Sequence, residues 1–412
     1  MNTYNEERLK AIEIIESLRS GVPSRALMSA VDDLRPQVLN LIRGDLDRLL
    51  SNDVPEGRLI WAGYGQGKSH FLRMAEQLAL GKNFAVSYVT LNRQVSLNNL
   101  TRFYQIAAPF IRTPDSNIPG LMNQLSRVDR NVLTETPIQN QERYVHPLPA
   151  IVVELLLHSS EEDFHSLYHH LMGDFLPIAE VRRLARIANL EHLLRQVERF
   201  KQEHIPAHFG VLEDVIRLCG YRGWVILIDE TELIGRLGRV SRLSAYRNLN
   251  WLLNWRKDMI CPVYTLAAVA SSLQQDVFSS SNRREGDRDT IPRIAGERFG
   301  QEVEEEMTKF FNRALIEDCP TLTAFGDNQL IPLLQQIAEW YRRAFTHERE
   351  PQPDWLNQVM VNVKGKPVRT YIRATLEVLD HYYLTGRIIP VQPDLLIEHP
   401  MEEKQDNNVV EQ

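Results

Sequence analysis

The chain has 412 residues, of which 43% are hydrophobic and 25% charged, and its formal net charge is −7 at pH 7. This length accommodates two or three domains with a substantial core, and the composition is that of an ordinary globular protein. The net charge excludes a global field that attracts nucleic acid, so any contact with DNA requires a local basic surface.

The cysteines and the apolar runs indicate the compartment. Cys219, Cys261 and Cys319 are far apart, odd in number and without C-x-x-C spacing. This argues against a disulfide framework or a zinc site and fits a reducing environment. The N-terminal residues are polar and acidic, so we expect no signal peptide, and apolar runs such as 151–157 are too short to span a bilayer. We therefore expect a cytoplasmic protein without a membrane segment.

Two helical stretches come first in the chain. Residues 6–20 carry apolar side chains at helical spacing and predict a helix that stops at the turn Gly21-Val22-Pro23-Ser24. A second helical stretch runs from about residue 24 to 50. Both precede a glycine-rich loop.

This loop follows a short apolar run. Residues 59–62 predict a buried strand, and the helix expected after the loop closes at Gly81. Between them stand Gly63, Tyr64, Gly65, Gln66, Gly67, Lys68, Ser69 and His70. Strand, glycine loop, Lys-Ser pair and helix are the context of a nucleotide-binding P-loop. Its glycines allow backbone N–H groups to face a polyphosphate, its lysine binds the β- and γ-phosphates, and its serine hydroxyl binds Mg²⁺.

The loop departs from the strict pattern G-x-x-x-x-G-K-[ST] at one position, because Ala62 stands where the first glycine is required. We expect Gly63 and Gly65 to supply the turn instead. A turn that contains Gly-Lys-Ser without binding phosphate is the alternative, and the flanking strand and helix disfavour it. The earlier turn at Val22 and Pro23 can then border the base of the nucleotide, although two helices that only pack give the same spacing.

A second strand is predicted at residues 84–91, which completes a βαβ unit and predicts a parallel sheet. From about residue 93 to 216 helical periodicity dominates, interrupted by prolines. We predict a mostly helical insertion there, with a flexible crossing near residues 134–148.

The sheet returns at residues 224–230, where an apolar run ends in Asp229 and Glu230. Asp229 is placed to complete a Mg²⁺ shell with Ser69, and Glu230 to orient and polarise the attacking water. Two acids at the end of a strand can also simply face solvent. The P-loop upstream favours the catalytic interpretation, because the two motifs together are more specific than either alone.

The remaining chain adds a third strand and a helical region. Residues 245–255 predict a helix and residues 263–270 a strand, followed by Ser271 and Ser272, which can contact the γ-phosphate or only cap the next helix. Residues 279–298 carry five arginines and predict a polar loop, solvated or acting on phosphate or DNA. Further helices are predicted at residues 303–315, 327–345 and 366–383, and a disordered tail beyond about residue 398.

This order of motifs resembles an AAA+ ATPase, nearest to the origin-recognition and Cdc6-like branch. A closer resemblance rests on residues 14–23, 63–70 and 227–230, which are similar to the ATP-binding family of BREX phage-defence systems and in particular to its shorter member. That family is similar in placing its glycines later than the strict pattern, which accounts for Ala62. The resemblance extends from about residue 10 to 390.

The resemblance implies an α/β fold with a parallel AAA+ sheet, a helical insertion and a C-terminal helical lid. The implied segments are 1–92 with the N-terminal helices and P-loop, 93–216 with the insertion, 217–300 with the rest of the core, 301–397 with the lid and 398–412 with the tail. It also implies that Val22 and Pro23 border the adenine. Ser271 or Ser272 would be the first sensor and Arg369 the second. Arg298, with Arg293 as a competitor, would be an arginine finger for a neighbouring subunit.

The implied function is an ATP-hydrolysing switch or motor in prokaryotic antiviral defence. It implies ATP and Mg²⁺ as ligands, a homo-oligomer, and partners such as a helicase-like protein. Contact with DNA is expected to be weak and independent of sequence, with Arg182, Arg183, Arg186 and residues 279–298 as basic candidates. The alternative is a nucleotide-sensing scaffold that binds ATP and assembles partners with little hydrolysis. Glu230 favours hydrolysis, because binding alone needs only the loop and Mg²⁺.

Overall fold

The computed structural model describes residues 3–21, 24–30, 35–50, 55–128, 138, 141–195, 197–256, 261–281, 285–345 and 354–388. The chain divides into two compact units. The first contains Met1–Leu34, Tyr64–Gly67 and Thr323–Gln412, and the second contains Arg35–Gly63 and Lys68–Leu322. None of the helices in the described part of the chain is long and apolar enough to cross a membrane.

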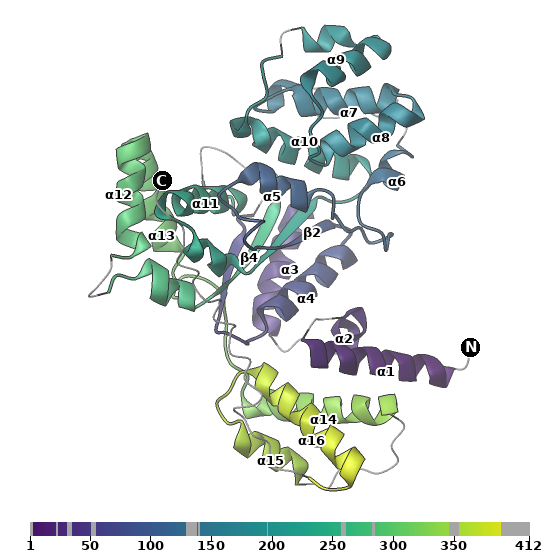
Figure 1. The fold of residues 1–412 in the computed structure, drawn as a ribbon, viewed down its shortest axis with the longest axis vertical. Helices are drawn as coiled ribbons and strands as arrows, with labels where there is room; N and C mark the ends of the chain where they lie inside the picture. Colours follow the sequence, from purple (N-terminus) through teal and green to yellow (C-terminus); the bar gives the residue numbers. More distant parts are fainter. Residues whose placement is uncertain are drawn as a thin grey trace, which may run out of the picture. The chain divides into compact units, whose positions relative to one another are not determined.

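The second unit is built on a five-stranded sheet (Figure 1). Its strands are β1 (Arg58–Ala62), β2 (Ala85–Thr90), β3 (Trp224–Asp229), β4 (Tyr264–Ala270) and β5 (Thr321–Leu322). They pair in parallel in the order β2-β3-β4-β1-β5. The predicted α/β class with a parallel sheet is confirmed. The sequence did not predict β5, which is only two residues long.

Helices cover both faces of this sheet. On one face, side chains such as Ile60 and Leu227 pack against α3 (Pro36–Leu50) and α4 (Lys68–Gly81). On the other face, Trp61 and Ile226 share a core with α11 (Arg239–Leu252) and with the helices inserted after β2. Strands buried on two faces read as continuous apolar runs, and every residue of β4 is buried. This is why the central strands were recognisable in the sequence.

The helical insertion lies between β2 and β3. Its helices are α5 (Leu100–Ala107), α6 (Met122–Leu125), α7 (Leu148–His158), α8 (Glu161–Leu171), α9 (Ile178–Ile187) and α10 (Ile205–Leu218), with 3₁₀ turns at Gln141–Arg143, Glu191–Leu194 and Gln202–His204. Helix α7 lies among α8, α9 and α10 (Figure 1). The predicted helical character is confirmed. Within the crossing predicted near residues 134–148, residues 134–137, 139 and 140 lie outside the described residues.

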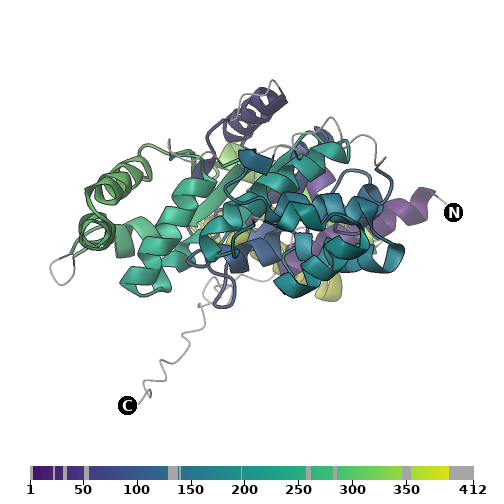
Figure 2. The same cartoon turned by 90° about the horizontal axis from the view of Figure 1, so that it is seen from above.

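The arginine-rich segment at residues 279–298 is largely helical, so the loop prediction was wrong for its second half. Helix α12 (Asp287–Phe299) buries Ile291 and Ala295 against Phe310 and Phe311 of α13 (Gln301–Arg313). These apolar contacts outweigh the unfavourable Pro292 inside the helix. Figures 1 and 2 show α12 and α13 side by side next to α11.

The first unit is helical. It contains α1 (Thr3–Ser20), α2 (Arg25–Ala30), α14 (Asp327–Phe345), α15 (Trp355–Asn362) and α16 (Val368–Thr385). Ile15 of α1, Ile337 of α14 and Leu379 of α16 share its core. The division by compactness thus differs from the expected segments, since α13 joins the sheet while α1 and α2 join the C-terminal helices. Residues 398–412, expected to be a disordered tail, lie outside the described residues.

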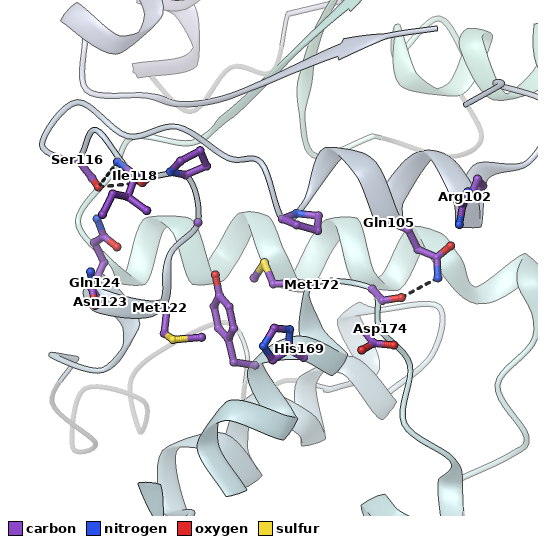
Figure 3. A pocket seen from close by; sticks show the side chains of 15 residues that line it. Arg102, Gln105, Ser116, Ile118, Met122, Asn123, Gln124, His169, Met172 and Asp174 are labelled. Atoms are coloured by element: carbon purple, nitrogen blue, oxygen red, sulfur yellow. Dashed lines mark hydrogen bonds between the residues drawn. The ribbon is translucent and has the colours of Figure 1, made fainter. Parts of the chain in front are cut away.

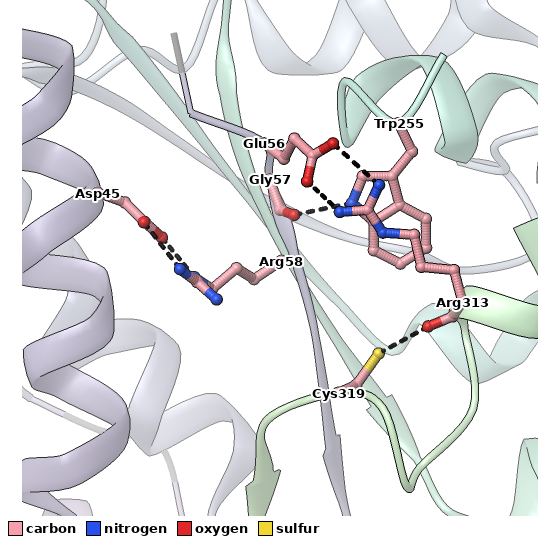
Figure 4. Close-up of polar contacts among 7 residues, drawn as sticks. All are labelled: Asp45, Glu56, Gly57, Arg58, Trp255, Arg313 and Cys319. Carbon is pink, nitrogen blue, oxygen red and sulfur yellow. Dashed lines mark hydrogen bonds and ion pairs between the residues drawn. The ribbon is translucent and has the colours of Figure 1, made fainter. Parts of the chain in front are cut away.

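Polar contacts hold the N-terminal end of β1, the strand that leads into the glycine loop (Figure 4). Arg58 forms a two-pronged ion pair with Asp45 of α3, with 2.8 Å between Nη2 and Oδ1. On the other side of the strand, the Trp255 indole N–H donates to the Gly57 carbonyl at 3.0 Å. The Arg313 guanidinium lies 4.4 Å from the centre of that indole ring. These contacts fix where β1 begins and therefore where its loop emerges.

Candidate functional site

The predicted site residues of the second unit follow three neighbouring parallel strands. β1 ends before Gly63, β3 before Glu230 and β4 before Ser271. Because carboxyl ends of parallel strands meet at one edge, these residues lie along the same side of the sheet. The backbone N–H of Ser271 donates to the Ala62 carbonyl at 2.9 Å, which fastens the end of β4 to the start of the loop.

The loop turns at Gly65 and Gly67. Their φ angles are +70° and +83°, values that favour glycine, whereas Gly63 is not among the residues with positive φ. The turn was expected at Gly63 and Gly65, but Gly65 and Gly67 are the glycines that form it. Ala62 is the last residue of β1 and fully buried, so this position has no need of glycine. The helix after the loop does end at Gly81, but the left-handed residue there is Asn83, with φ +66°.

Lys68 begins α4 and points at a carboxylate that the sequence analysis did not single out. Its Nζ lies 3.0 Å from Oε1 of Glu232, and both side chains are largely buried. Oε2 of Glu232 accepts a hydrogen bond from the Ala270 N–H at 3.0 Å. The only signal for Glu232 in the sequence was its place two residues after Glu230. Its pairing with Lys68 depends on the 3₁₀ helix η6 (Thr231–Arg236), which turns the chain back toward the loop.

Asp229 is held by a tyrosine that sequence reasoning also missed. The Tyr88 hydroxyl donates to Oδ2 of Asp229 at 2.7 Å. The nearby Ser69 side chain acts on the same phenol and lowers its pKa slightly. The Glu230 N–H donates to Oδ1 of Asp229 at 2.9 Å. Burial, and then Asp229 itself, raise the pKa of Tyr88, so the phenol stays a neutral donor.

These contacts bear on the expected magnesium site. Asp229 accepts a hydrogen bond from the Tyr88 hydroxyl, and the Ser69 side chain lies near the same phenol. A hydroxyl and one carboxylate, completed by substrate phosphates and water, are a donor set that suits Mg²⁺. The residues present therefore fit the ion.

Glu230 has a backbone conformation that is rare outside glycine. Its φ and ψ are +59° and +34°, and non-glycine residues held in this region cluster at functional sites. Burial raises the pKa of its carboxyl group, Glu232 raises it further, and Lys68 acts in the opposite direction. A carboxylate with a raised pKa is a better acceptor for a proton from water.

Comparison with known proteins bears on the same loop. Residues 7–142 match the model of the family described as BREX system ATP-binding protein BrxC/D. The predicted resemblance is thereby confirmed over the stretch that contains α1, the glycine loop and β2. No curated protein matches the chain.

One similar solved structure is that of the Aeropyrum pernix ORC2 protein in ADPNP–ADP complexes. It is 14% identical, the TM-score is 0.41, and the match covers 89% of this chain and 66% of that one. The chain thus spans slightly less than two thirds of that protein.

The resemblance also implied roles for Val22, Pro23 and Arg369, and these residues belong to the first unit. There the Arg369 guanidinium lies 2.8 Å from where a Cβ on Gly21 would stand, and Pro367 lies 2.7 Å from that of Gly65. Gly21, Gly65 and the start of α16 thus lie close together within the first unit. Val22 and Pro23 lie outside the described residues. Tyr64 is exposed at the tip of the loop.

The other predicted residues divide between buried and exposed positions. His70 follows the Lys-Ser pair on α4, and burial, with a smaller effect of Arg35, lowers its pKa to about 4, so the ring is neutral at pH 7. Arg298 and Arg293 are exposed on α12, and Arg293 forms an ion pair with Glu285 at 3.2 Å.

The insertion contains a separate cavity of about 490 Å³ (Figure 3). Arg102, Gln105 and Asp174 stand at one end, and Met122 and Met172 line its middle. None of the predicted nucleotide-site residues lines it. The glycine loop at the sheet edge therefore remains the candidate site.

Proposed function

We propose that this chain binds MgATP at residues 63–69 and hydrolyses it, acting as a cytoplasmic switch or motor in a prokaryotic phage-defence system of the BREX type. The observation that carries the proposal is the meeting of Lys68, Ser69, Asp229 and Glu230 at one edge of the sheet. The family match, whose description names ATP binding, supports the choice of nucleotide.

Binding is assigned to the loop and to α4. Backbone N–H groups at the start of α4 face the phosphates, and the Lys68 ammonium contacts the β- and γ-phosphate oxygens. Ser69 and Asp229 hold Mg²⁺, which neutralises charge on those oxygens during transfer. Tyr88 keeps Asp229 in place through its hydroxyl.

Hydrolysis is assigned to Glu230. Its carboxylate orients a water molecule for attack on the γ-phosphorus and accepts the proton that the water loses. The proposed first sensor, Ser271, is fastened beside Ala62 and can donate a hydrogen bond to the γ-phosphate. Arg369 of α16 is the proposed second sensor.

A nucleotide-sensing scaffold is the second candidate. ATP binding, which the family description names, is all that this function requires of the nucleotide site. Glu230 separates the two candidates, because a scaffold needs the loop and Mg²⁺ but no base.

Phosphate release, measured with and without DNA, tests the choice. Glu230→Gln keeps the shape of the side chain but not the base, so it should retain ATP and lose turnover by roughly 10² to 10⁴. Glu305→Gln, at an exposed carboxylate of α13, is the matched control. If Glu230→Gln turns over ATP at the wild-type rate, Glu230 is not the catalytic base. No turnover in the wild type favours the scaffold.

We further propose a homo-oligomer that works with defence partners such as a helicase-like protein and touches DNA weakly. Arg182 and Arg186 are exposed on α9 and available for phosphate contacts, whereas Arg183 already pairs with Glu180 and Asp163. Filter binding at two salt concentrations, with ATP and with a slowly hydrolysed analogue, tests DNA binding. Retention at low salt only with nucleotide supports it. No retention assigns DNA to a partner.

A further inference from the structure

Glu232 joins two parts of the site that lie on different elements. One oxygen of its carboxylate takes the Lys68 ammonium at 3.0 Å, and the other accepts the N–H of Ala270, the last residue of β4, at 3.0 Å. The Glu232 side chain is 16% exposed and that of Lys68 is 9% exposed. A buried pair of this kind is costly to break from one side, because the remaining charge is left without a partner.

The contacts continue from Ala270 back to the loop. Ser271 follows Ala270, and its N–H binds the Ala62 carbonyl. The path from Lys68 through Glu232 and β4 therefore returns to the residue at which the loop begins. One carboxylate thus closes a ring of contacts around the glycine loop.

A flexible lysine benefits from such an acceptor. Its ammonium is a compact charge on a four-carbon stem, with three N–H donors that can rotate. An ion pair with Glu232 engages one donor and leaves two for phosphate oxygens. Because the same carboxylate is bound to β4, the position of the ammonium follows that of the strand end.

We propose that Glu232 is a positioning residue that holds the Lys68 ammonium in register with the end of β4, and so couples the phosphate-binding loop to Ser271. This inference rests on the proposed function, because it assigns a γ-phosphate to the space between Lys68 and Ser271. Glu232 itself contacts no reacting atom.

The coupling predicts a specific pattern in Glu232→Gln, which keeps an acceptor for Ala270 but removes the charge that holds Lys68. We expect kcat to fall roughly 10- to 100-fold, as for small misplacements of a catalytic group. The preference for ATP over ADP should fall several-fold, because the lysine loses its register with the γ-phosphate. ADP affinity should stay within about threefold, since the loop backbone still binds the other phosphates.

Titration calorimetry with ADP and with a slowly hydrolysed ATP analogue, beside phosphate release, tests the inference in the full chain. Glu232→Asp is a second variant, because its shorter side chain cannot span Lys68 and Ala270 together, and it should show the same loss of ATP preference. Glu305→Gln serves again as control. Wild-type kcat and wild-type ATP preference in both Glu232 variants overturn the inference.

An equal loss of ADP and ATP affinity also overturns it, because that result means general damage to the loop. If the wild type binds ATP but does not hydrolyse it, proposed hydrolysis fails, and the ratio of ADP to ATP affinity still decides the role of Glu232.

Discussion

The edge of the sheet and the histidine cluster of the helical insertion bury polar groups differently. At the edge, buried charges have partners: Lys68 with Glu232 and Asp229 with Tyr88. In the insertion, His208 is fully buried among Phe175, Phe200 and Tyr104, and neither ring nitrogen has a hydrogen-bond partner within the described chain. The edge thus keeps these charged groups paired. The cluster around His208 instead keeps neutral rings, and the fold opposes their protonation.

The largest expected effect is a loss of ATP hydrolysis when the proposed arginine finger is removed. In the proposed homo-oligomer the site lies between subunits, and an arginine of the neighbour stabilises transition-state charge, an effect of roughly 10³–10⁵ in rate where arginine fingers have been measured. We expect Arg298→Ala, or failing that Arg293→Ala, to lower hydrolysis strongly while leaving ATP binding by the monomer nearly intact. Mass photometry should show larger species with ATP. If the protein stays monomeric with ATP and both variants hydrolyse ATP at the wild-type rate, the proposed subunit interface is wrong.

Lys68→Ala should weaken ATP binding by at least roughly 100-fold, because it removes the phosphate-facing charge and leaves the Glu232 carboxylate without its cationic partner. Arg102→Ala is the control, because it also removes a cationic side chain but lies in the cavity of the insertion. It should leave ATP affinity unchanged. Titration calorimetry on folded variants measures both. Equal affinities for Lys68→Ala and the wild type would assign ATP to another part of the chain.

A smaller effect is expected when Tyr88 loses its hydroxyl. Tyr88→Phe should raise the Mg²⁺ concentration required for half-maximal ATP binding roughly tenfold, since residues that hold metal ligands usually contribute that much. Tyr104→Phe removes a buried hydroxyl of the insertion that donates to the Leu171 carbonyl at 2.7 Å. It should leave the Mg²⁺ requirement unchanged. Identical Mg²⁺ curves for both variants would show that Tyr88 only packs.

The insertion should be the part of the molecule most sensitive to acid. Burial lowers the pKa of His170 to about 4 and that of His208 well below its usual value. Below the unfolded pKa of about 6.5 the unfolded chain binds these protons while the native chain does not. Stability is therefore lost as pH falls from 6.5 toward 4, by about 1.4 kcal/mol per pH unit for each histidine.

Hydrogen exchange between pH 7 and 5 measures this effect locally. Protection should fall in α8 and α10, which carry His170 and His208, before it falls in β3 and β4. In His208→Leu the free energy of unfolding should depend less steeply on pH, by the contribution of one proton bound on unfolding. Uniform loss of protection over the whole chain would refute the contrast between the two regions.

The glycine loop and the acidic strand end were accessible to sequence reasoning because their signals are local. Residues 58–70 form strand, loop and helix within one short stretch, and Asp229 and Glu230 directly follow an apolar run. The parallel sheet followed from the βαβ order, and burial on both faces made its central strands apolar throughout. The insertion was recognisable by helical periodicity alone.

Tyr88 and Glu232 became site residues only through the tertiary structure. Tyr88 lies in the middle of β2, and its contact with Asp229 depends on the pairing of β2 with β3. Glu232 reaches Lys68 because Glu230 adopts a left-handed conformation and η6 turns back toward the loop. The same holds for α12, whose polar sequence is helical because Ile291 and Ala295 find a partner in α13. Periodicity and motif spacing record what neighbours in the chain do, whereas these contacts join residues far apart in sequence, which only packing brings together.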